Sequence, residues 1–297
     1  MSESTPPVCS YEGSDYQQSF WDQGGRAYED AAEAIALKKL LPQNGKFLLE
    51  LGAGAGRNTP RYKNYQRIAL LDYSRTQLEQ ARDRLGISDR YIYVAADIYH
   101  LPFIDAVFDG ATMIRTLHHM ADPLLALSEV RRVMGSDGVF ILEFANKRNF
   151  KAILRYILKK QDWNPFSLEP VEFAELNFDF HPQAIKRYLS ENQFVIEKQL
   201  SVSFFRVGFL KKHIPTRLLA GLDSLFQWTG SIAQYSPSVF TMARTVSSGQ
   251  ALSQAEGLFR CVTCGKPLQG VENDLTCDSC GAVWEYRDGI YDFRPKK

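Results

Sequence analysis

Glycine recurs at every second position of a short stretch near residue 50, directly after an apolar run. Residues 47–51 are apolar apart from Glu50, and Gly52, Gly54 and Gly56 follow. Glycine adopts backbone angles closed to other residues and lets a ligand approach the main chain. A buried parallel strand that ends in such a loop and leads into a helix is how doubly wound α/β sheets build a nucleotide site. We therefore expect a nucleotide-like ligand at this loop.

The spacing of the glycines departs from the dinucleotide fingerprint G-x-G-x-x-G. Arg57 occupies the place of the third glycine, and Gly56 comes one residue early. Glu50 precedes Gly52 by two residues, where a carboxylate would be unfavourable beside a phosphate but would suit a positively charged amino group. A nicotinamide dinucleotide is therefore disfavoured. A glycine-rich turn without any ligand is the alternative.

Acidic residues follow the next two predicted strands. Residues 67–71 lead into Asp72, 22 positions after Glu50, and residues 91–95 lead to Asp97. A carboxylate at the tip of the second strand can accept both hydrogen bonds of a ribose with free hydroxyls. A further strand, a helix and another strand are predicted at 108–114, 123–134 and 139–144. This order predicts an α/β fold with a mainly parallel sheet.

These motifs resemble those of the class I S-adenosylmethionine (SAM) methyltransferases. The pattern Glu50-x-Gly52-x-Gly54-x-Gly56 matches the family's first motif. The run LHHMADP followed by LSEVRRVMGSDGVFILEF is similar to members that act on small molecules, including those of quinone biosynthesis. The resemblance covers about residues 45–146. It implies a Rossmann-like, seven-stranded methyltransferase sheet with helical insertions, and SAM as the cofactor.

The resemblance also implies which residues bind SAM. In this family an acid in the position of Asp97 accepts from the adenine amino group, and the N-terminal part covers the cofactor. In the family an aromatic residue such as Tyr28 often approaches the cofactor, and simple packing is the alternative role for Tyr28. Tyr16, Phe20 and Trp21 could pack over the sheet. The expected cofactor-binding residues are Tyr28, Glu50, Gly52, Gly54, Gly56, Asp72, Tyr73, Asp97, Ile98 and Arg115.

Several side chains are candidates for a general base near the transferred methyl group. Methyl transfer from a sulfonium is a displacement in which the protein mainly supplies alignment, and a base is needed only if the acceptor must lose a proton. A histidine could deprotonate a phenol or an enol near neutral pH. We expect catalytic roles for His118, His119 and His181, with Asp179 as a further candidate and a structural role for the paired histidines as the alternative. Arg115 could pair with an acidic acceptor or with a nearby carboxylate.

The segment after the fourth strand also bears on the acceptor. N-methylases of exocyclic amines and amides often carry Asn/Asp-Pro-Pro-Tyr/Phe here, whereas residues 115–118 read Arg-Thr-Leu-His. Methylation of that type is therefore disfavoured.

Two C-x-x-C-G motifs, separated by 12 residues, lie near the C-terminal end. Their cysteines are Cys261, Cys264, Cys277 and Cys280. Four thiolates make a closed tetrahedral site that suits structural zinc. A domain of about 40 residues cannot bury enough surface to fold unaided, so the metal would supply most of its folding free energy. An iron centre of the rubredoxin kind and two disulfides are the alternatives, the latter disfavoured without a signal peptide.

The C-terminal segment, with CGKPL and then WEYRDGIY, resembles the small zinc-ribbon activator subunit of tRNA, rRNA and translation-factor methyltransferases. The resemblance covers only about 40 residues. It implies a partner fused in cis that stabilises the catalytic domain.

We expect four parts along the chain. They are a disordered N-terminus (1–10), a methyltransferase domain (11–247) with lid insertions at 147–180 and 204–235, a linker (248–256) and a zinc ribbon (257–297). Connections as long as the two insertions are usually lids or binding loops. The second insertion mixes apolar residues with basic ones, including Arg206 and Lys211, so packing, a lid over a lipophilic acceptor and contact with a membrane surface all fit it.

Composition limits the remaining possibilities. Lys and Arg number 35 against 34 Asp and Glu, a net charge of +1, which gives no general attraction to nucleic acid. No run approaches 18 apolar residues, and the N-terminus lacks the layout of a signal peptide, so we expect a cytoplasmic protein. The sequence therefore predicts a SAM-dependent methyltransferase that modifies a small organic acceptor by O- or C-methylation. Methylation of RNA or a translation-related protein, and a non-catalytic SAM-binding module, are the alternatives.

Overall fold

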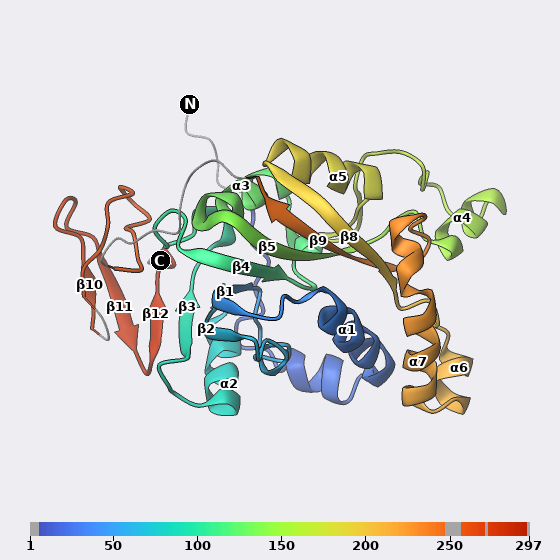
Figure 1. Cartoon of the computed structure of the whole chain (residues 1–297), viewed down its shortest axis with the longest axis horizontal. Coiled ribbons are helices and arrows are strands. Elements are labelled where there is room, and N and C mark those ends of the chain that lie inside the picture. Colours follow the sequence, from blue (N-terminus) through green and yellow to red (C-terminus); the bar gives the residue numbers. More distant parts are fainter. Residues whose placement is uncertain (1–5, 247–256, 271–272, 296–297) are drawn as a thin grey trace.

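The computed structural model describes residues 6–246, 257–270 and 273–295. Its centre is a ten-stranded sheet in the order β10-β11-β12-β3-β2-β1-β4-β5-β9-β8 (Figure 1). Its strands are β1 (Gly45–Leu51), β2 (Tyr65–Asp72), β3 (Tyr91–Ala95), β4 (Phe108–Met113), β5 (Met134–Ala145), β8 (Phe194–Val202), β9 (Ser238–Thr245), β10 (Leu275–Thr276), β11 (Val283–Arg287) and β12 (Ile290–Asp292). A separate hairpin pairs β6 (Val171–Ala174) with β7 (Asn177–Asp179).

Helices connect and cover these strands. They are α1 (Ala27–Leu40), α2 (Arg75–Leu85), α3 (Pro123–Val133), α4 (Phe150–Ile157), α5 (Pro182–Glu191), α6 (Gly208–His213) and α7 (Thr216–Phe226). Shorter turns of helix are η1 (Gln17–Asp22), η2 (Thr59–Arg61), η3 (Ile98–His100), η4 (Leu117–His119) and η5 (Gln227–Ser231). None of these described helices is long and apolar enough to cross a membrane.

The sheet separates two apolar layers because strand side chains alternate between its faces. Leu49 and Leu51 of β1 belong to the cluster that includes α3 and α5, whereas Leu48 belongs to the cluster that includes α1 and α2. Figure 1 shows these helix pairs on opposite sides of the sheet. The parallel strands β3, β2, β1, β4 and β5 therefore form a covered α/β core, whose carboxyl ends meet at one edge.

The prediction of a seven-stranded sheet is wrong in its count. The five strands predicted by residue range are present as β1, β2, β3, β4 and β5, and β9 and β8 complete the seven that the resemblance implies. Three strands of the C-terminal segment then extend the same sheet. β12 runs parallel to β3, with Ile290 opposite Tyr93 and Asp292 opposite Ala95. β12 thus pairs with the edge of β3 that would otherwise be exposed to solvent.

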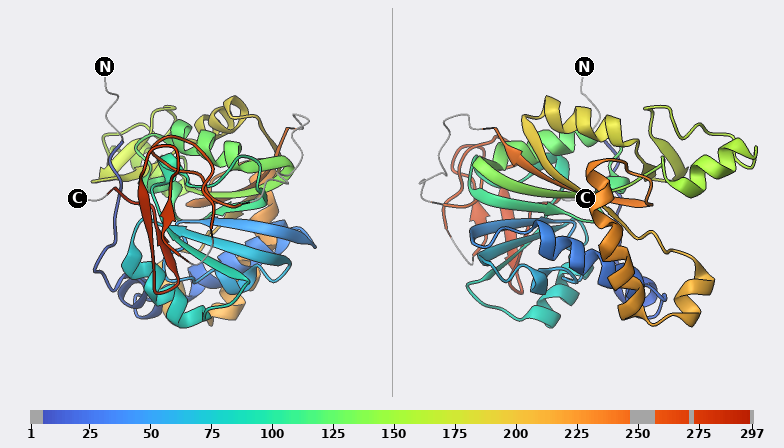
Figure 2. Two further views of the ribbon diagram at one scale, coloured as in Figure 1. Left: turned by 90° about the vertical axis from the view of Figure 1, so that its left-hand side faces the viewer. Right: turned by 45° about the vertical axis from the view of Figure 1, so that its right-hand side comes forward.

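The C-terminal segment shares its apolar core with the rest of the chain. Phe259 stacks on Phe103, with ring centroids 5.7 Å apart, and also contacts Tyr291 at 4.6 Å. The amide of Phe293 donates to the carbonyl of Ala95 at 2.8 Å. Both views in Figure 2 show these strands against the same edge of the sheet. The segment therefore packs as a continuation of the sheet.

The two predicted insertions form small helical and hairpin units beside the sheet. Residues 147–180 contain α4 and the β6–β7 hairpin, and residues 204–235 contain α6, α7 and η5. α7 packs on α1, where its Leu219 and Ala220 are buried. Much of the remaining apolar surface of both insertions is exposed to solvent, including Phe209, Leu225 and Trp228. The predicted linker at 248–256 and residues 1–5 of the predicted N-terminal tail lie outside the described residues.

Candidate functional site

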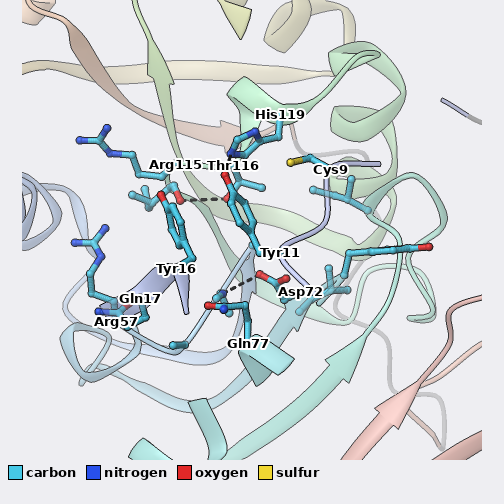
Figure 3. Close-up of a pocket in the computed structure, with 18 of the residues that line it drawn as sticks. Cys9, Tyr11, Tyr16, Gln17, Arg57, Asp72, Gln77, Arg115, Thr116 and His119 are labelled. Carbon is cyan, nitrogen blue, oxygen red and sulfur yellow. Dashed lines mark hydrogen bonds between the residues drawn. The ribbon is translucent and has the colours of Figure 1, made fainter. Parts of the chain in front are cut away.

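A pocket lies at the carboxyl ends of β1, β2 and β4, the edge where open α/β sheets bind ligands (Figure 3). It holds about 910 Å³ of space, part of it open to solvent. The loops after β1, β2, β3 and β4 form its floor. The N-terminal segment covers it with Val8, Cys9, Tyr11, Tyr16, Gln17 and Trp21.

The glycine loop requires glycine for two separate reasons. Gly52, Gly54 and Gly56 have φ of 65°, 53° and 70°, which is left-handed backbone that favours glycine. A Cβ on Gly52 would also lie 2.1 Å from Oγ1 of Thr116, an impossible contact. At Gly54 the nearest atom to a Cβ would be Oε1 of Gln77, 3.9 Å away, so the main chain faces open space there.

Asp72 joins the tip of β2 to this loop. Its Oδ2 accepts from the amide of Gly54 at 2.8 Å, and its Oδ1 accepts from the amide of Ser74 at 2.9 Å. Each carboxylate oxygen keeps a further lone pair, so Asp72 can accept additional hydrogen bonds from a ligand in the pocket. Burial raises the pKa of this carboxyl above its ordinary value.

Six of the ten expected cofactor residues line the pocket. They are Gly52, Gly54, Asp72, Tyr73, Ile98 and Arg115, and the other four are Tyr28, Glu50, Gly56 and Asp97.

Those four residues take structural positions around the pocket. Glu50 is buried, with its Oε2 accepting from the Thr59 hydroxyl at 2.6 Å, and burial raises the pKa of Glu50 to about 8. Gly56 packs against α2, and the carboxylate of Asp97 caps η3 by accepting from the amide of Tyr99 at 2.9 Å.

Tyr28 points toward α7. Its hydroxyl donates to Asp223 at 2.8 Å and accepts from the amide of Phe205 at 3.0 Å. The aromatic cover of the pocket comes from the preceding segment, where Tyr11 packs on Tyr16 with centroids 4.4 Å apart. The aromatic density of residues 11–21 was the available signal for this cover.

A buried ion cluster fixes the other side of the pocket; pairing of Arg115 with a nearby carboxylate was one of its two predicted roles, but the sequence did not identify the partner. Glu33 of α1 is fully buried and pairs with Arg57 of the glycine loop and with Arg115 of the loop after β4. Burial opposes ionisation, but the guanidinium groups of Arg115 and Arg57 hold the pKa of Glu33 at about 2. The Arg57 guanidinium also lies 3.5 Å from the centroid of the Trp21 ring. Arg57, which replaces a fingerprint glycine, therefore ties the loop to α1 and to the aromatic cover.

His119 is the one of the three candidate histidines that lines the pocket. Its Nδ1 is 3.0 Å from the carbonyl of Leu176, so Nδ1 carries the proton and Nε2 accepts from the Tyr11 hydroxyl at 3.2 Å. Burial lowers the pKa of His119, which favours the neutral ring.

The other base candidates lie elsewhere. His118 contacts the ring of His119, with centroids 4.0 Å apart, and burial lowers its pKa well below the usual value. His181 caps α5, where its Nδ1 accepts from the amide of Gln183 at 3.1 Å. Asp179 lies on β7, and burial raises its pKa to about 6. The structure does not bring these three side chains to the pocket lining.

The four cysteines of the C-terminal segment form one cluster. Their Sγ atoms all lie within 4.8 Å of one another, and Cys261–Cys280 and Cys264–Cys277 are 3.7 and 3.5 Å apart. Four sulfurs at 2.3 Å from a zinc ion would be about 3.8 Å apart, so the cluster fits that ion. Gly265 and Gly281, each directly after a second cysteine, have φ of 74° and 73°, as the tight turns of such a site require.

Comparisons with known proteins agree with this geometry. Residues 49–142 match the family described as Methyltransferase domain. The chain is 29% identical over 134 residues to the 27-O-demethylrifamycin SV methyltransferase of Amycolatopsis mediterranei, covering 42% of this chain and 49% of that protein. It is 36% identical over 129 residues to the demethylmenaquinone methyltransferase of Chlamydia trachomatis, covering 42% and 55%. The chain thus spans about half the length of these curated relatives.

Solved structures show the same fold. A SAM-dependent methyltransferase of Thermotoga maritima superposes with a TM-score of 0.54 at 20% identity, covering 78% of this chain and 95% of that one. A chain of the complex containing the Trm112 methyltransferase activator of Haloferax volcanii gives a TM-score of 0.54 at 16% identity, covering 76% and 93%. Residues 49–142 are therefore similar to methyltransferase domains, and the sheet that carries them has the Rossmann-like fold of solved SAM-dependent methyltransferases.

Proposed function

We propose that the chain is an enzyme that transfers a methyl group from SAM to a small organic acceptor by O- or C-methylation. The observation that carries this proposal is the position of Asp72, between the glycine loop and Tyr73, in an aromatic-covered pocket at the carboxyl edge. The similarity of residues 49–142 to methyltransferases of small molecules supports it.

The pocket residues fit the chemical groups of SAM. Asp72 has free acceptor capacity for the ribose hydroxyls, and Ala96, Ile98 and Met120 give an apolar wall for the adenine ring. The cationic Arg115 suits the carboxylate of the methionine part. Gln77 lines the pocket, and its Oε1 is buried without a hydrogen-bond partner among the described residues. This oxygen is therefore available to a donor group of a ligand. Tyr28, Glu50, Gly56 and Asp97 then act indirectly, by holding the surrounding loops.

SAM, when bound, supplies a methyl group on a sulfonium, which is reactive without further activation. The protein therefore has to exclude water and align the acceptor. Tyr11 and Tyr16 provide the cover that excludes water. Nε2 of the neutral His119 accepts from the Tyr11 hydroxyl in this structure, and it can take a proton from a phenol or an enol when the acceptor displaces that hydroxyl, because Nδ1 is held by the carbonyl of Leu176. We assign the role of general base to His119. His118 packs against the His119 ring, and His181 caps the start of α5.

The cysteine cluster completes the proposal as a structural zinc site. Four sulfur ligands leave no position for water, so this zinc would stabilise the fold of residues 257–270 and 273–295, and thereby the pairing of β12 with the edge of β3. Thiolates kept for a metal fit a reducing compartment, which supports a cytoplasmic location.

Methylation of RNA or of a translation-related protein is the second candidate. Its support is the ribbon, which resembles a methyltransferase activator and pairs with β3 within the same chain. A SAM-binding module without transfer is the non-enzymatic alternative.

A label-transfer assay separates these possibilities. The purified protein is incubated with methyl-labelled SAM and with extract divided into small-molecule, RNA and protein pools. The proposal expects label in the small-molecule pool. Label in RNA or protein would replace it with the second candidate, and bound SAM without transfer to any pool would favour the non-catalytic module.

A further inference from the structure

Arg206 has a buried guanidinium group that lacks hydrogen-bond partners. Its Nε and Nη2 are both shielded from solvent and make no hydrogen bond within the described residues. A buried cation without partners destabilises a fold, because it loses its hydration and gains nothing in return. Such a group is therefore expected where a ligand supplies the missing acceptors.

The sheet topology places Arg206 at the same edge as the pocket. β8 and β5 both run antiparallel to β9, so they run parallel to each other. Their ends are level, because Val202 of β8 and Ala145 of β5 both pair with Ser238. The residues that follow β8 therefore emerge at the carboxyl edge, where the loop after β4 carries Arg115 and His118.

The main chain that leads to Arg206 is fixed. The amides of Ser203 and Phe204 donate to the carboxylate of Asp223, and the amide of Phe205 donates to the Tyr28 hydroxyl at 3.0 Å. Arg206 thus follows directly on a segment held by α7 and α1, which orders the start of its side chain.

Three of the four carboxylates that act on the charge of Arg206 are already engaged by other groups. Glu33 pairs with Arg57 and Arg115. Glu29 pairs with Lys211 at 2.9 Å. Glu143 accepts from the amide of Arg115 and from the Ser238 hydroxyl.

Asp179 is the fourth carboxylate: it makes no hydrogen bond to Arg206, and burial raises its pKa to about 6 although the charge of Arg206 opposes this rise. Burial and the nearby Arg115 together lower the pKa of Arg206 to about 10. A cation thus remains, with donors that no side chain of the described chain satisfies.

We propose that Arg206 binds an anionic group of the methyl acceptor, a carboxylate or a phosphate. This inference rests on the proposed methyl transfer and names the acceptor class for the same sheet edge. The planar guanidinium offers Nε and Nη2 in the fork that matches two oxygens of either group.

The test uses simple anions as probes. Benzoate and inorganic phosphate are titrated into the full-length protein, the Arg206→Gln variant and the control Arg187→Gln, while thermal stability is recorded. Arg187 is an exposed arginine of α5 and serves as the matched control. We expect saturable stabilisation of the wild type and of the control by at least one anion, and at least tenfold weaker binding by Arg206→Gln. Whether benzoate or phosphate binds identifies the anion.

Two further readouts keep the outcomes separate. Without anion, Arg206→Gln should be at least as stable as the wild type, because it removes an unpaired buried charge, whereas a structural arginine would destabilise on removal. SAM affinity should change less than twofold. Equal anion binding by wild type and Arg206→Gln, no saturable binding of either anion, or a strongly destabilised variant would overturn the proposal. If the wild type does not bind SAM at all, the proposed function is overturned instead.

A second, independent observation concerns α4. Phe150, Leu154 and Ile157 are spaced to lie on one helix face, and they are 68%, 46% and 66% exposed. Lys151, Arg155, Lys159 and Lys160 are the charged residues of positions 149–161, which contain no acid. The right-hand view of Figure 2 shows this helix projecting from the body of the protein.

We infer that α4 docks on the surface of an anionic lipid bilayer. An exposed apolar face flanked only by Lys and Arg is the pattern of helices that lie in the membrane interface, where both the apolar contact and the positive charge contribute. Anionic lipid complements the four cations of this segment, which an apolar protein partner would leave unmatched.

Co-sedimentation with vesicles tests this inference. The full-length protein should bind vesicles of phosphatidylcholine with phosphatidylglycerol, bind phosphatidylcholine alone at least tenfold more weakly, and lose binding as salt rises. The double variant Leu154→Asp, Ile157→Asp should lose binding, whereas Ile87→Asp, at an exposed apolar position outside α4, should keep it. Equal binding by the double variant, no binding by the wild type, or self-association in solution that the double variant abolishes would overturn it.

Discussion

Glu33 of α1 and Arg115 of the loop after β4 form a buried ion pair, with Oε1 of Glu33 2.8 Å from Nε of Arg115. Arg57 binds the other carboxylate oxygen at 2.8 Å. The carboxylate of Glu33 thus holds the loops after β1 and β4 against α1, the helix that follows the aromatic segment covering the pocket. The pocket depends on this pair, although Glu33 itself does not line it.

Replacing Glu33 by Gln should destabilise the protein. The variant leaves the largely buried Arg115 without its counterion and Arg57 with Asp30 alone, and breaking a buried pair in this way costs about 3–5 kcal/mol. The measurement is the free energy of unfolding by denaturant at neutral pH. Glu197→Gln, which affects an exposed pair with Arg244, is the control and should change it by less than about 1 kcal/mol. Similar values for the two variants would contradict the role given to Glu33.

The pH dependence of stability should differ between Glu33 and Glu50. The folded pKa of Glu33 is lowered from 4.5 to about 2, so its contribution is present above 4.5 and is lost as pH falls toward 2. The folded pKa of Glu50 is raised from 4.5 to about 8, mainly by burial, so its contribution is present below 4.5 and is lost as pH rises through 8.

Unfolding of the wild type and Glu50→Gln at pH 5 and pH 9 checks the second sign. The neutral amide cannot ionise, so the stability of the variant relative to the wild type should rise between these values. A constant difference would show that Glu50 does not titrate within the fold over this range.

Removal of metal should unfold the described residues 257–270 and 273–295 and expose the edge of β3. We expect about one zinc per chain, lost in Cys277→Ser and retained in Cys9→Ser, which lies outside the cluster. Chelation should also weaken SAM binding, because Arg294 pairs with Glu12 at 2.7 Å and Glu12 accepts from the amide of Arg75 beside the pocket. A chelated protein with unchanged thermal stability would refute the zinc assignment.

His119 and His181 should respond differently to the same substitution. His119→Asn should reduce methyl transfer by about 10²–10⁴-fold, the usual contribution of a general base, with little change in SAM affinity. His181→Asn should leave transfer within about twofold, because Asn is an effective N-cap and preserves the start of α5. Rates are compared with the acceptor pool that takes up label. An equal loss in both variants, or none in His119→Asn, would remove His119 from the reaction.

The sequence predicted the strands of the α/β core well, because their information is local. β3 is found at the predicted residues 91–95, and β1 ends at the glycine loop that opens the pocket. The pairing of β12 with β3 joins residues about 200 positions apart, and no local pattern encodes such a contact. The sheet was therefore predicted with seven strands where ten are present.

Side-chain directions were predicted less well than positions. Glu50 and Asp97 occupy the expected places, but Thr59 and the amide of Tyr99 engage their carboxylates. Tyr28 is turned away by Asp223, which lies in the second insertion. Each of these outcomes depends on a partner that lies outside the motif, so the motif alone did not reveal it.

Calorimetric titration of SAM tests most directly that this pocket holds the cofactor. The account predicts that one SAM binds per wild-type chain and that Asp72→Ala binds about 5- to 150-fold more weakly, since about 1–3 kcal/mol is lost when the ribose hydroxyls are left unpaired. Asp83→Ala, on the exposed side of α2, should bind as the wild type does. Absence of SAM binding by the wild type, or equal affinity in Asp72→Ala, would contradict the account.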